Sequence, residues 1–287
     1  MSVNGDQHYF VGDMDFCNFG KQFSESVYYR CLLIVRLIIC IVGICLCTTV
    51  LLSKLNSVIL HVHSRILIKY HIILTLILAL NYVSISVFEL FRLSRRVAPC
   101  DYLMPRWLSF FPHFITTTMI HSQILSCMLI TIERLICTVQ IRTYENANYK
   151  KSLIFGLFLL TITVILVSFA ILGLTANWEI KLFYVSFRDT TNHYYATCYV
   201  FAQFCGDLIT VILCKIVDVL NRRTKRKFVN GLIGIKHQGN QLSSKLQIRE
   251  SIALSSTLMP IIVSHFIITA FSALVITVIM LVSACCI

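Results

Sequence analysis

The chain has 287 residues, of which 57% are hydrophobic and 13% are charged, against about 45–50% and about 25% in an ordinary soluble domain. A soluble globule of this length cannot bury so much apolar surface, and a disordered chain would be poor in hydrophobic residues. With only 10 Gly and 4 Pro, the chain is neither collagen-like nor a low-complexity array. The composition therefore predicts an integral membrane protein that has lipid as its solvent.

The formal net charge of +12 would suit a nucleic-acid-binding protein only if the bases shared one solvated face. Most Lys and Arg residues instead lie between apolar runs, so they indicate membrane topology, and no nucleic-acid partner is expected. The 13 cysteines would suggest a disulfide scaffold in a small secreted protein. Most of them lie in or beside apolar runs, so they are interpreted as small hydrophobic residues.

Residues 1–29 are mostly polar and lack the apolar core of a cleavable signal peptide. They are predicted to form an extracellular N-terminal segment, with the first membrane span acting as the targeting signal.

Residues 30–287 are predicted to form a transmembrane helical bundle, because a helix needs roughly 20 apolar residues to cross a bilayer. An apolar stub over 275–287 is too short for a separate crossing. We therefore expect an all-α membrane protein, in which a seventh helix, if one was intended, is truncated or absent. The six stretches of sufficient length are 30–52, 68–90, 109–132, 153–176, 195–217 and 251–274.

The distribution of Lys and Arg predicts the orientation of the chain, since basic residues near span ends resist translocation. An extracellular N terminus makes the segments 53–69, 133–151 and 215–249 cytoplasmic. These segments hold 16 Lys and Arg residues, against 8 in the segments on the other side. The N terminus is therefore predicted to lie outside.

Glu133 and Arg134 form an acid–arginine doublet at the cytoplasmic end of the third span. One interpretation is a simple boundary pair, in which Arg134 reaches out to the lipid headgroups and Glu133 offsets its charge. The alternative is a functional pair, which its position and the predicted topology favour.

Four short segments are informative together because of their order and spacing. They are Leu60-His61-Val62-His63-Ser64-Arg65, Pro99-Cys100-Asp101, Ile132-Glu133-Arg134 with Tyr144-Glu145, and Leu242-Ser243-Ser244-Lys245-Leu246-Gln247 running into Glu250. The doublet resembles the acid–arginine pair at the inner end of helix three in G-protein-coupled receptors. The four segments resemble more specifically the nematode serpentine chemoreceptors of the Sra superfamily, nearest to its alpha and alpha/beta classes.

The resemblance implies a rhodopsin-like bundle that binds a small molecule from outside and signals to a heterotrimeric G protein by rearranging helices three and six. Glu250, at the inner start of the sixth span, is the acid that could hold Arg134, or it could merely neutralise Arg249. Pro260 should kink the sixth helix, either as a hinge or only for packing. The implied location is the plasma membrane, in sensory cilia of chemosensory neurons.

Receptors of this broad type often bridge helix three to the second outer loop, and Cys100 with Cys198 is the pair expected here. Cys17 is a competing partner, because sequence does not assign disulfide connectivity.

Polar residues at membrane depth usually face the protein interior. Arg36 and Glu89 lie at comparable depth and could pair as structural glue. Asp207 is central in its span and is either a functional buried charge or a neutral, hydrogen-bonded carboxyl. The ligand cavity is expected between the outer halves of the third, fifth and sixth spans, with the candidates His113, Thr117, Tyr199, Gln203, Asp207 and Phe271.

Aromatic residues at the outer span ends, among them Trp107, Trp178 and Tyr194, are interpreted as headgroup anchors. Below the fifth span lies a basic cluster, for which anionic lipid and a G protein are alternative partners. The cluster comprises Arg222, Arg223, Lys225, Arg226 and Lys227.

The chain has no GxGxxG, GxxxxGK, HExxH or paired CxxC motif, so neither an enzyme nor a cofactor or metal site is predicted. The competing functions are a transporter or channel subunit and a truncated receptor that does not signal. Transporters usually show internal repeats, broken helices and several intramembrane charges. This chain shows no internal repeat, one clear midplane acid and a single well-placed proline, which weakens that alternative.

Overall fold

The computed structural model describes residues 25–54, 62–94, 104–139, 150–179, 181–182 and 193–229, with a few residues between 252 and 267. Within this part of the chain, five helices are long and apolar enough to cross a membrane. They overlap the first five predicted spans and confirm the all-α membrane class. Most of the sixth span and the whole stub lie outside the described residues.

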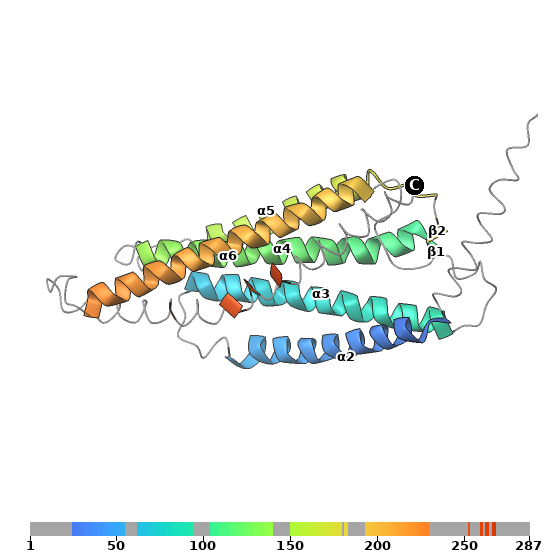
Figure 1. Cartoon of the computed structure of the whole chain (residues 1–287), viewed down its shortest axis with the longest axis horizontal. Coiled ribbons are helices and arrows are strands. Elements are labelled where there is room, and N and C mark those ends of the chain that lie inside the picture. Colours follow the sequence, from blue (N-terminus) through green and yellow to red (C-terminus); the bar gives the residue numbers. More distant parts are fainter. Residues whose placement is uncertain are drawn as a thin grey trace, which may run out of the picture. The chain divides into compact units, whose positions relative to one another are not determined.

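Helices dominate because lipid offers no partner to backbone N–H and C=O groups, so each spanning segment must satisfy its own hydrogen bonds. Two short strands, β1 (Met104–Pro105) and β2 (Lys181–Leu182), pair antiparallel, with Met104 opposite Leu182. The helices, labelled in Figure 1, are α2 (Val27–Thr49), its π-helical continuation η1 (Val50–Lys54), α3 (Val62–Ser94), α4 (Arg106–Val139), α5 (Lys150–Leu172) and α6 (His193–Val229).

Several helices continue beyond the apolar stretches that predicted them. The third stretch was expected to end at 132, but α4 reaches Val139, and α6 continues from 217 to Val229. Hydropathy marks where a chain enters and leaves lipid, whereas a helix ends where its backbone hydrogen bonds end. The polar and basic residues that follow each apolar stretch do not break a helix.

The chain divides into two compact units, which are described separately. The first unit comprises residues 1–54, 73–120 and 165–196, and the second comprises residues 55–72, 121–164 and 197–287. Helix α2 belongs to the first unit, whereas α3, α4 and α5 each contribute a part to both.

In the first unit, α2 lies along α3 (Figure 1) and is held there by arginines. Arg36 Nε donates to Ser86 Oγ at 2.8 Å, and its guanidinium lies over the Tyr82 ring, 5.5 Å from the centroid. Glu89 pairs instead with Arg92, at 2.5 Å. The predicted pairing of Arg36 with Glu89 is therefore wrong. The partner of Arg36 is nevertheless close to the expected position, because Ser86 lies one helical turn from Glu89 on α3. It is a neutral hydroxyl rather than a carboxylate.

An aromatic cluster in the first unit joins α4 to α5 and to the segment that follows α5. The Phe110 ring is fully buried and lies 5.0 Å from Trp178 and 5.7 Å from Phe114, between centroids. Phe114 in turn meets Phe169 of α5 edge-to-face at 5.9 Å. Offset and edge-to-face ring pairs stabilise beyond the area they bury, so this cluster fixes the N-terminal part of α4.

Arg106 is fully buried as the first residue of α4. A short polar bridge also links α3 to α4. Asn81 Nδ2 donates to Pro112 O at 2.7 Å and to Thr116 Oγ1 at 2.8 Å. Pro112 lies inside α4, where a proline interrupts the helical hydrogen bonding, so the amide supports the helix at its weakest turn.

The second unit has an apolar core formed by Leu67 of α3, Ile130 of α4 and Leu157 of α5. Tyr70 and Thr161 are hydrogen-bonded beside it at 2.7 Å. Gly206 lets α6 approach α4 closely, since a Cβ at this position would lie 3.2 Å from Ile124 Cγ2.

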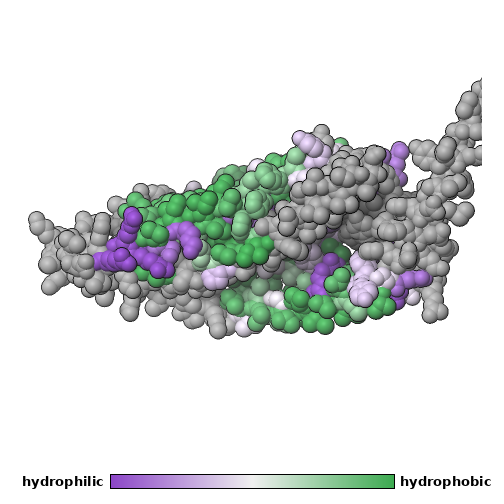
Figure 2. Space-filling view, in the orientation of Figure 1, coloured by the Kyte–Doolittle hydropathy of each residue, from purple (hydrophilic) through white to green (hydrophobic). Residues whose placement is uncertain are grey.

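Many of the other large apolar residues are exposed, and Figure 2 shows green surface over the helices. Ile38 of α2 is 56% exposed and Phe158 of α5 is 61% exposed. Such continuous apolar surface would promote aggregation in water, but it matches the lipid of a bilayer. Trp107, Trp178 and Tyr194 are also exposed, in agreement with their interpretation as anchors.

Candidate functional site

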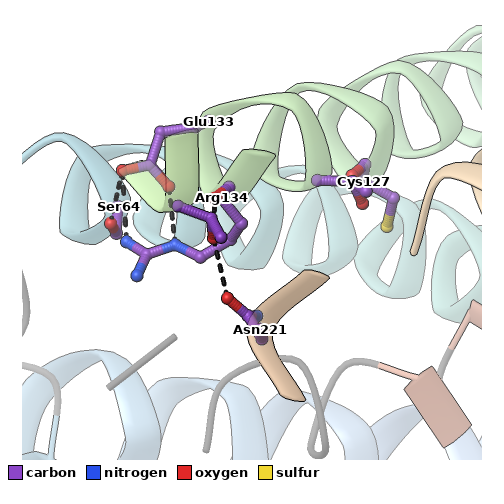
Figure 3. A network of polar contacts seen from close by, with 7 residues as sticks. Ser64, Cys127, Glu133, Arg134 and Asn221 are labelled. Atoms are coloured by element: carbon purple, nitrogen blue, oxygen red, sulfur yellow. Dashed lines mark hydrogen bonds and ion pairs between the residues drawn. The ribbon is translucent and has the colours of Figure 1, made fainter. Parts of the chain in front are cut away.

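Glu133 and Arg134, in the second unit, bind each other near the C-terminal end of α4 (Figure 3). Arg134 Nε donates to Glu133 Oε2 at 2.7 Å, and Arg134 Nη2 donates to Oε1 at 3.1 Å. The exposed fractions of the two side chains are 2% for Arg134 and 11% for Glu133. Because Arg134 is buried in protein, the interpretation in which it reaches out to headgroups is wrong. The pairing of its charge with Glu133 is what the structure shows.

Ser64 connects this ion pair to α3. Its hydroxyl is fully buried and donates to Glu133 Oε1 at 2.8 Å (Figure 3). A buried carboxylate needs both a counter-charge and hydrogen-bond donors to offset its desolvation. Arg134 supplies the charge, and Ser64 supplies a neutral donor from a neighbouring helix.

Asn221 connects the same part of α4 to α6. Thr138 Oγ1 lies 2.8 Å from Arg134 O and 2.7 Å from the side-chain oxygen of Asn221, which is 1% exposed. The contact with Asn221 joins side chains of two helices, whereas the contact with Arg134 O lies within α4.

The two links make one polar network, which we call the α4 network: Ser64, Glu133, Arg134, Thr138 and Asn221. It ties three helices together at the carboxyl end of α4. Breaking a buried ion pair leaves an uncompensated charge, so Arg134 leaves its place only when another acceptor or water replaces Glu133. The network therefore depends on a few directed polar contacts.

The other residues predicted to take part in the switch are only partly described. Pro260 is helical and exposed. Glu250 lies outside the described residues, so its contact with Arg134 stays a prediction. Cys198 is an exposed free thiol on α6, and Cys100 lies outside the described residues, so their disulfide also stays a prediction.

The predicted ligand-binding residues fall in both units. In the first, Thr117 is buried one turn beyond the half-buried His113 and donates to its carbonyl at 2.9 Å. In the second, Tyr199, Gln203 and Asp207 follow one another at four-residue intervals on α6, so they share one face of that helix. Phe271 lies outside the described residues.

The face of α6 that carries these residues meets α4 within the second unit. The Tyr199 ring stacks on His121, with centroids 3.9 Å apart, and Asp207 is only 4% exposed. His121 was noted in the sequence as a polar residue at membrane depth but was not among the ligand candidates. Its stacking on Tyr199 adds it to the residues that line this face.

Another polar cluster of the second unit joins α3 to α4 around His71. Its Nδ1 lies 2.6 Å from Ser126 Oγ and 3.8 Å from Cys127 Sγ. Ser126 itself donates to Gln123 O at 3.0 Å, so Nδ1 is the donor to its hydroxyl. Among the described residues, no three His, Cys, Asp or Glu side chains are placed to hold a metal ion.

Thr138 and Asn221 were missed in the sequence, and Ser64 was noted only as part of a family motif. A usable signal was present on α6, where buried residues recur every three or four positions and continue past the apolar stretch. Reading this stripe to its end would have marked Asn221 as an inward-facing amide. The stripe comprises Asp207, Thr210, Cys214, Val217 and Asn221.

Comparison with known proteins places this geometry in context. Residues 14–286 match a family model described as serpentine type 7TM GPCR receptor class ab chemoreceptor. No curated protein is significantly similar to the chain.

Proposed function

The chain belongs to the class ab family of serpentine seven-helix chemoreceptors, and from this premise we propose that it detects a small molecule outside the cell and signals to a heterotrimeric G protein. The family is a class of multi-pass membrane receptors. The proposed orientation places the N terminus outside the plasma membrane and the α4 network on the cytoplasmic side, as the excess of basic residues favours.

The buried Glu133–Arg134 pair is the observation that carries this proposal. A structural boundary pair would be expected to reach solvent or headgroups, whereas this pair is shielded and is held by Ser64. Once its ion pair with Glu133 breaks, the Arg134 guanidinium offers five N–H hydrogen-bond donors. A G protein that offers carbonyl or carboxylate acceptors could then bind it.

The proposed mechanism is a shift between two packings of the helices. A ligand that prefers the packing in which the α4 network is open shifts the equilibrium toward that state by its difference in affinity. The ligand-binding candidates remain His113 and Thr117 of α4, then Tyr199, Gln203 and Asp207 of α6, and Phe271. Glu250 as an added restraint on Arg134, and Pro260 as a hinge, complete the proposal.

The test needs no ligand. We would reconstitute the purified chain and its Glu133→Gln variant in lipid nanodiscs and measure GTPγS binding by heterotrimeric G proteins from each major subclass. Glutamine keeps the shape of glutamate but removes the charge that holds Arg134. The variant should therefore raise ligand-independent nucleotide exchange on at least one subclass, by about tenfold if a hydrogen bond to a charged group of about 1.4 kcal/mol is lost.

Two further variants decide how that result is interpreted. Adding Arg134→Ala to Glu133→Gln should abolish the gain, because the freed guanidinium is gone. Lys150→Gln removes an exposed charge from the first turn of α5 and should change nothing. The proposal fails if folded Glu133→Gln protein stimulates no G protein, or if its gain survives Arg134→Ala.

A further inference from the structure

The end of α6 carries exposed bases on one side. Arg222, Arg223 and Arg226 are exposed, whereas Asn221 and Val217 are each 1% exposed. Successive helical residues are rotated by about 100°, so all three arginines lie about 100° or more from both buried residues around the helix axis. The bases therefore point away from the protein interior.

The same side of α6 faces lipid further back along the helix. Ile212 is 51% exposed and Ile216 is 45% exposed, and both lie within about 40° of Arg223 around the helix axis. The exposed bases therefore continue the lipid-facing stripe rather than the side that holds the α4 network. The hydrophilic patch at the far end of α6 in Figure 2 adjoins apolar surface.

The depth of these bases matches the headgroup layer. The apolar stretch of α6 ends at 217, so Arg222, Arg223 and Arg226 follow it by five to nine residues, or about 8–14 Å along the helix. Lys215 is also exposed, two turns earlier and in line with Arg222, from where its flexible chain can reach the same layer. Asp218 offsets one base through a 3.0 Å ion pair with Arg222, and the surface stays positive.

We propose that this face of α6, made of Lys215, Arg222, Arg223 and Arg226, binds the headgroups of anionic lipids. A G protein that binds Arg134 would contact the buried side of α6. That side carries Asn221 and not these bases. Phosphate and carboxylate groups at the membrane surface complement an outward-facing positive stripe. The inference depends on the exposure of the bases and not on receptor activity.

Lipid selectivity can be measured with the full chain in phosphatidylcholine vesicles. Spin-labelled phosphatidylserine or phosphatidylcholine is added as the probe, and electron paramagnetic resonance reports the fraction held at the protein surface. We expect about a threefold preference for phosphatidylserine at low salt, which should fall as salt screens the charges. Arg223→Gln with Arg226→Gln should remove most of the preference, while Arg223→Lys with Arg226→Lys should keep it.

The matched control removes two exposed bases elsewhere, by Lys150→Gln with Lys151→Gln at the start of α5. The proposal predicts a clearly smaller loss in this variant. Equal losses would mean that net charge alone selects the lipid, and would overturn the proposal. It would also be overturned if the α6 double variant kept its lipid preference but lowered G-protein activation by the Glu133→Gln protein. A negative lipid result leaves the receptor proposal standing, because the assay involves neither ligand nor G protein.

Discussion

The two parts of α4 are held by different kinds of contact. In the first unit, the N-terminal part packs through the rings around Phe110. In the second unit, the C-terminal part is held by an ion pair, a serine hydroxyl and an amide. Ring packing spreads its contacts over many atoms of several side chains, whereas each polar contact depends on one or two atoms.

This difference separates a fixed part from a switchable one. Buried rings find no equivalent partner in another packing, so moving them costs the whole cluster at once. Hydrogen bonds can be exchanged for water or for the groups of a partner protein at little net cost. We therefore expect mutations in the first unit to change stability, and mutations in the α4 network to change signalling.

The largest expected effect is loss of the Phe110 ring. Phe110→Ala leaves a cavity among Phe111, Phe114 and Trp178 and should lower the free energy of unfolding by about 3–5 kcal/mol. The measurement is unfolding by SDS titration in mixed micelles. Trp107→Ala, three residues earlier in the sequence but 56% exposed, should have little effect. Similar losses in both variants would show that the cluster does not determine stability.

A variant of Asn81 tests whether every polar contact between helices affects signalling, or only those of the α4 network. Asn81→Ala removes both bonds to α4, from Pro112 O and Thr116 Oγ1, and should cost about 1–2 kcal/mol of unfolding free energy. Ligand-independent nucleotide exchange should stay at the wild-type level. Ser84→Ala is the control, since its exposed hydroxyl bonds only to the carbonyl of Leu80 on its own helix. Increased basal exchange in Asn81→Ala would contradict the division between the two parts.

Asn221 should show the opposite pattern. Asn221→Ala removes the link between α6 and Thr138, and a membrane hydrogen bond of this kind contributes about 0.6 kcal/mol on average. Stability should fall by about that amount, and basal exchange should rise by about threefold if the bond exists only in the resting packing. The measurement is GTPγS binding without ligand. A fall in basal exchange would show that the amide supports the active packing instead.

The sequence predicted the five described helices because apolar stretches of spanning length have few other uses. It also located Glu133 and Arg134 at the end of α4, since motif and topology agree there. One interpretation of the sequence already had Glu133 offset the charge of Arg134, but the sequence did not identify Ser64, on another helix, as the donor that completes the arrangement. Arg36 shows the same limit, because hydropathy gives its depth but does not identify Ser86 as its partner.

The smallest expected effect is that of Asp218→Asn. It compares an exposed polar contact with the buried contact of Asn221, one turn away on α6. Asp218 pairs with Arg222 at 3.0 Å, but the Arg222 side chain is 70% exposed, and exposed helical ion pairs contribute about 0.3–0.5 kcal/mol. Asp218→Asn should therefore leave both unfolding and basal exchange nearly unchanged, although it lies one turn from Asn221. It should increase the preference for phosphatidylserine, because it frees Arg222 and removes a negative charge from the basic face. If Asp218→Asn raised basal exchange as much as Asn221→Ala, proximity to the end of α6 rather than the buried amide would explain both results, and the α4 network would lose its proposed role.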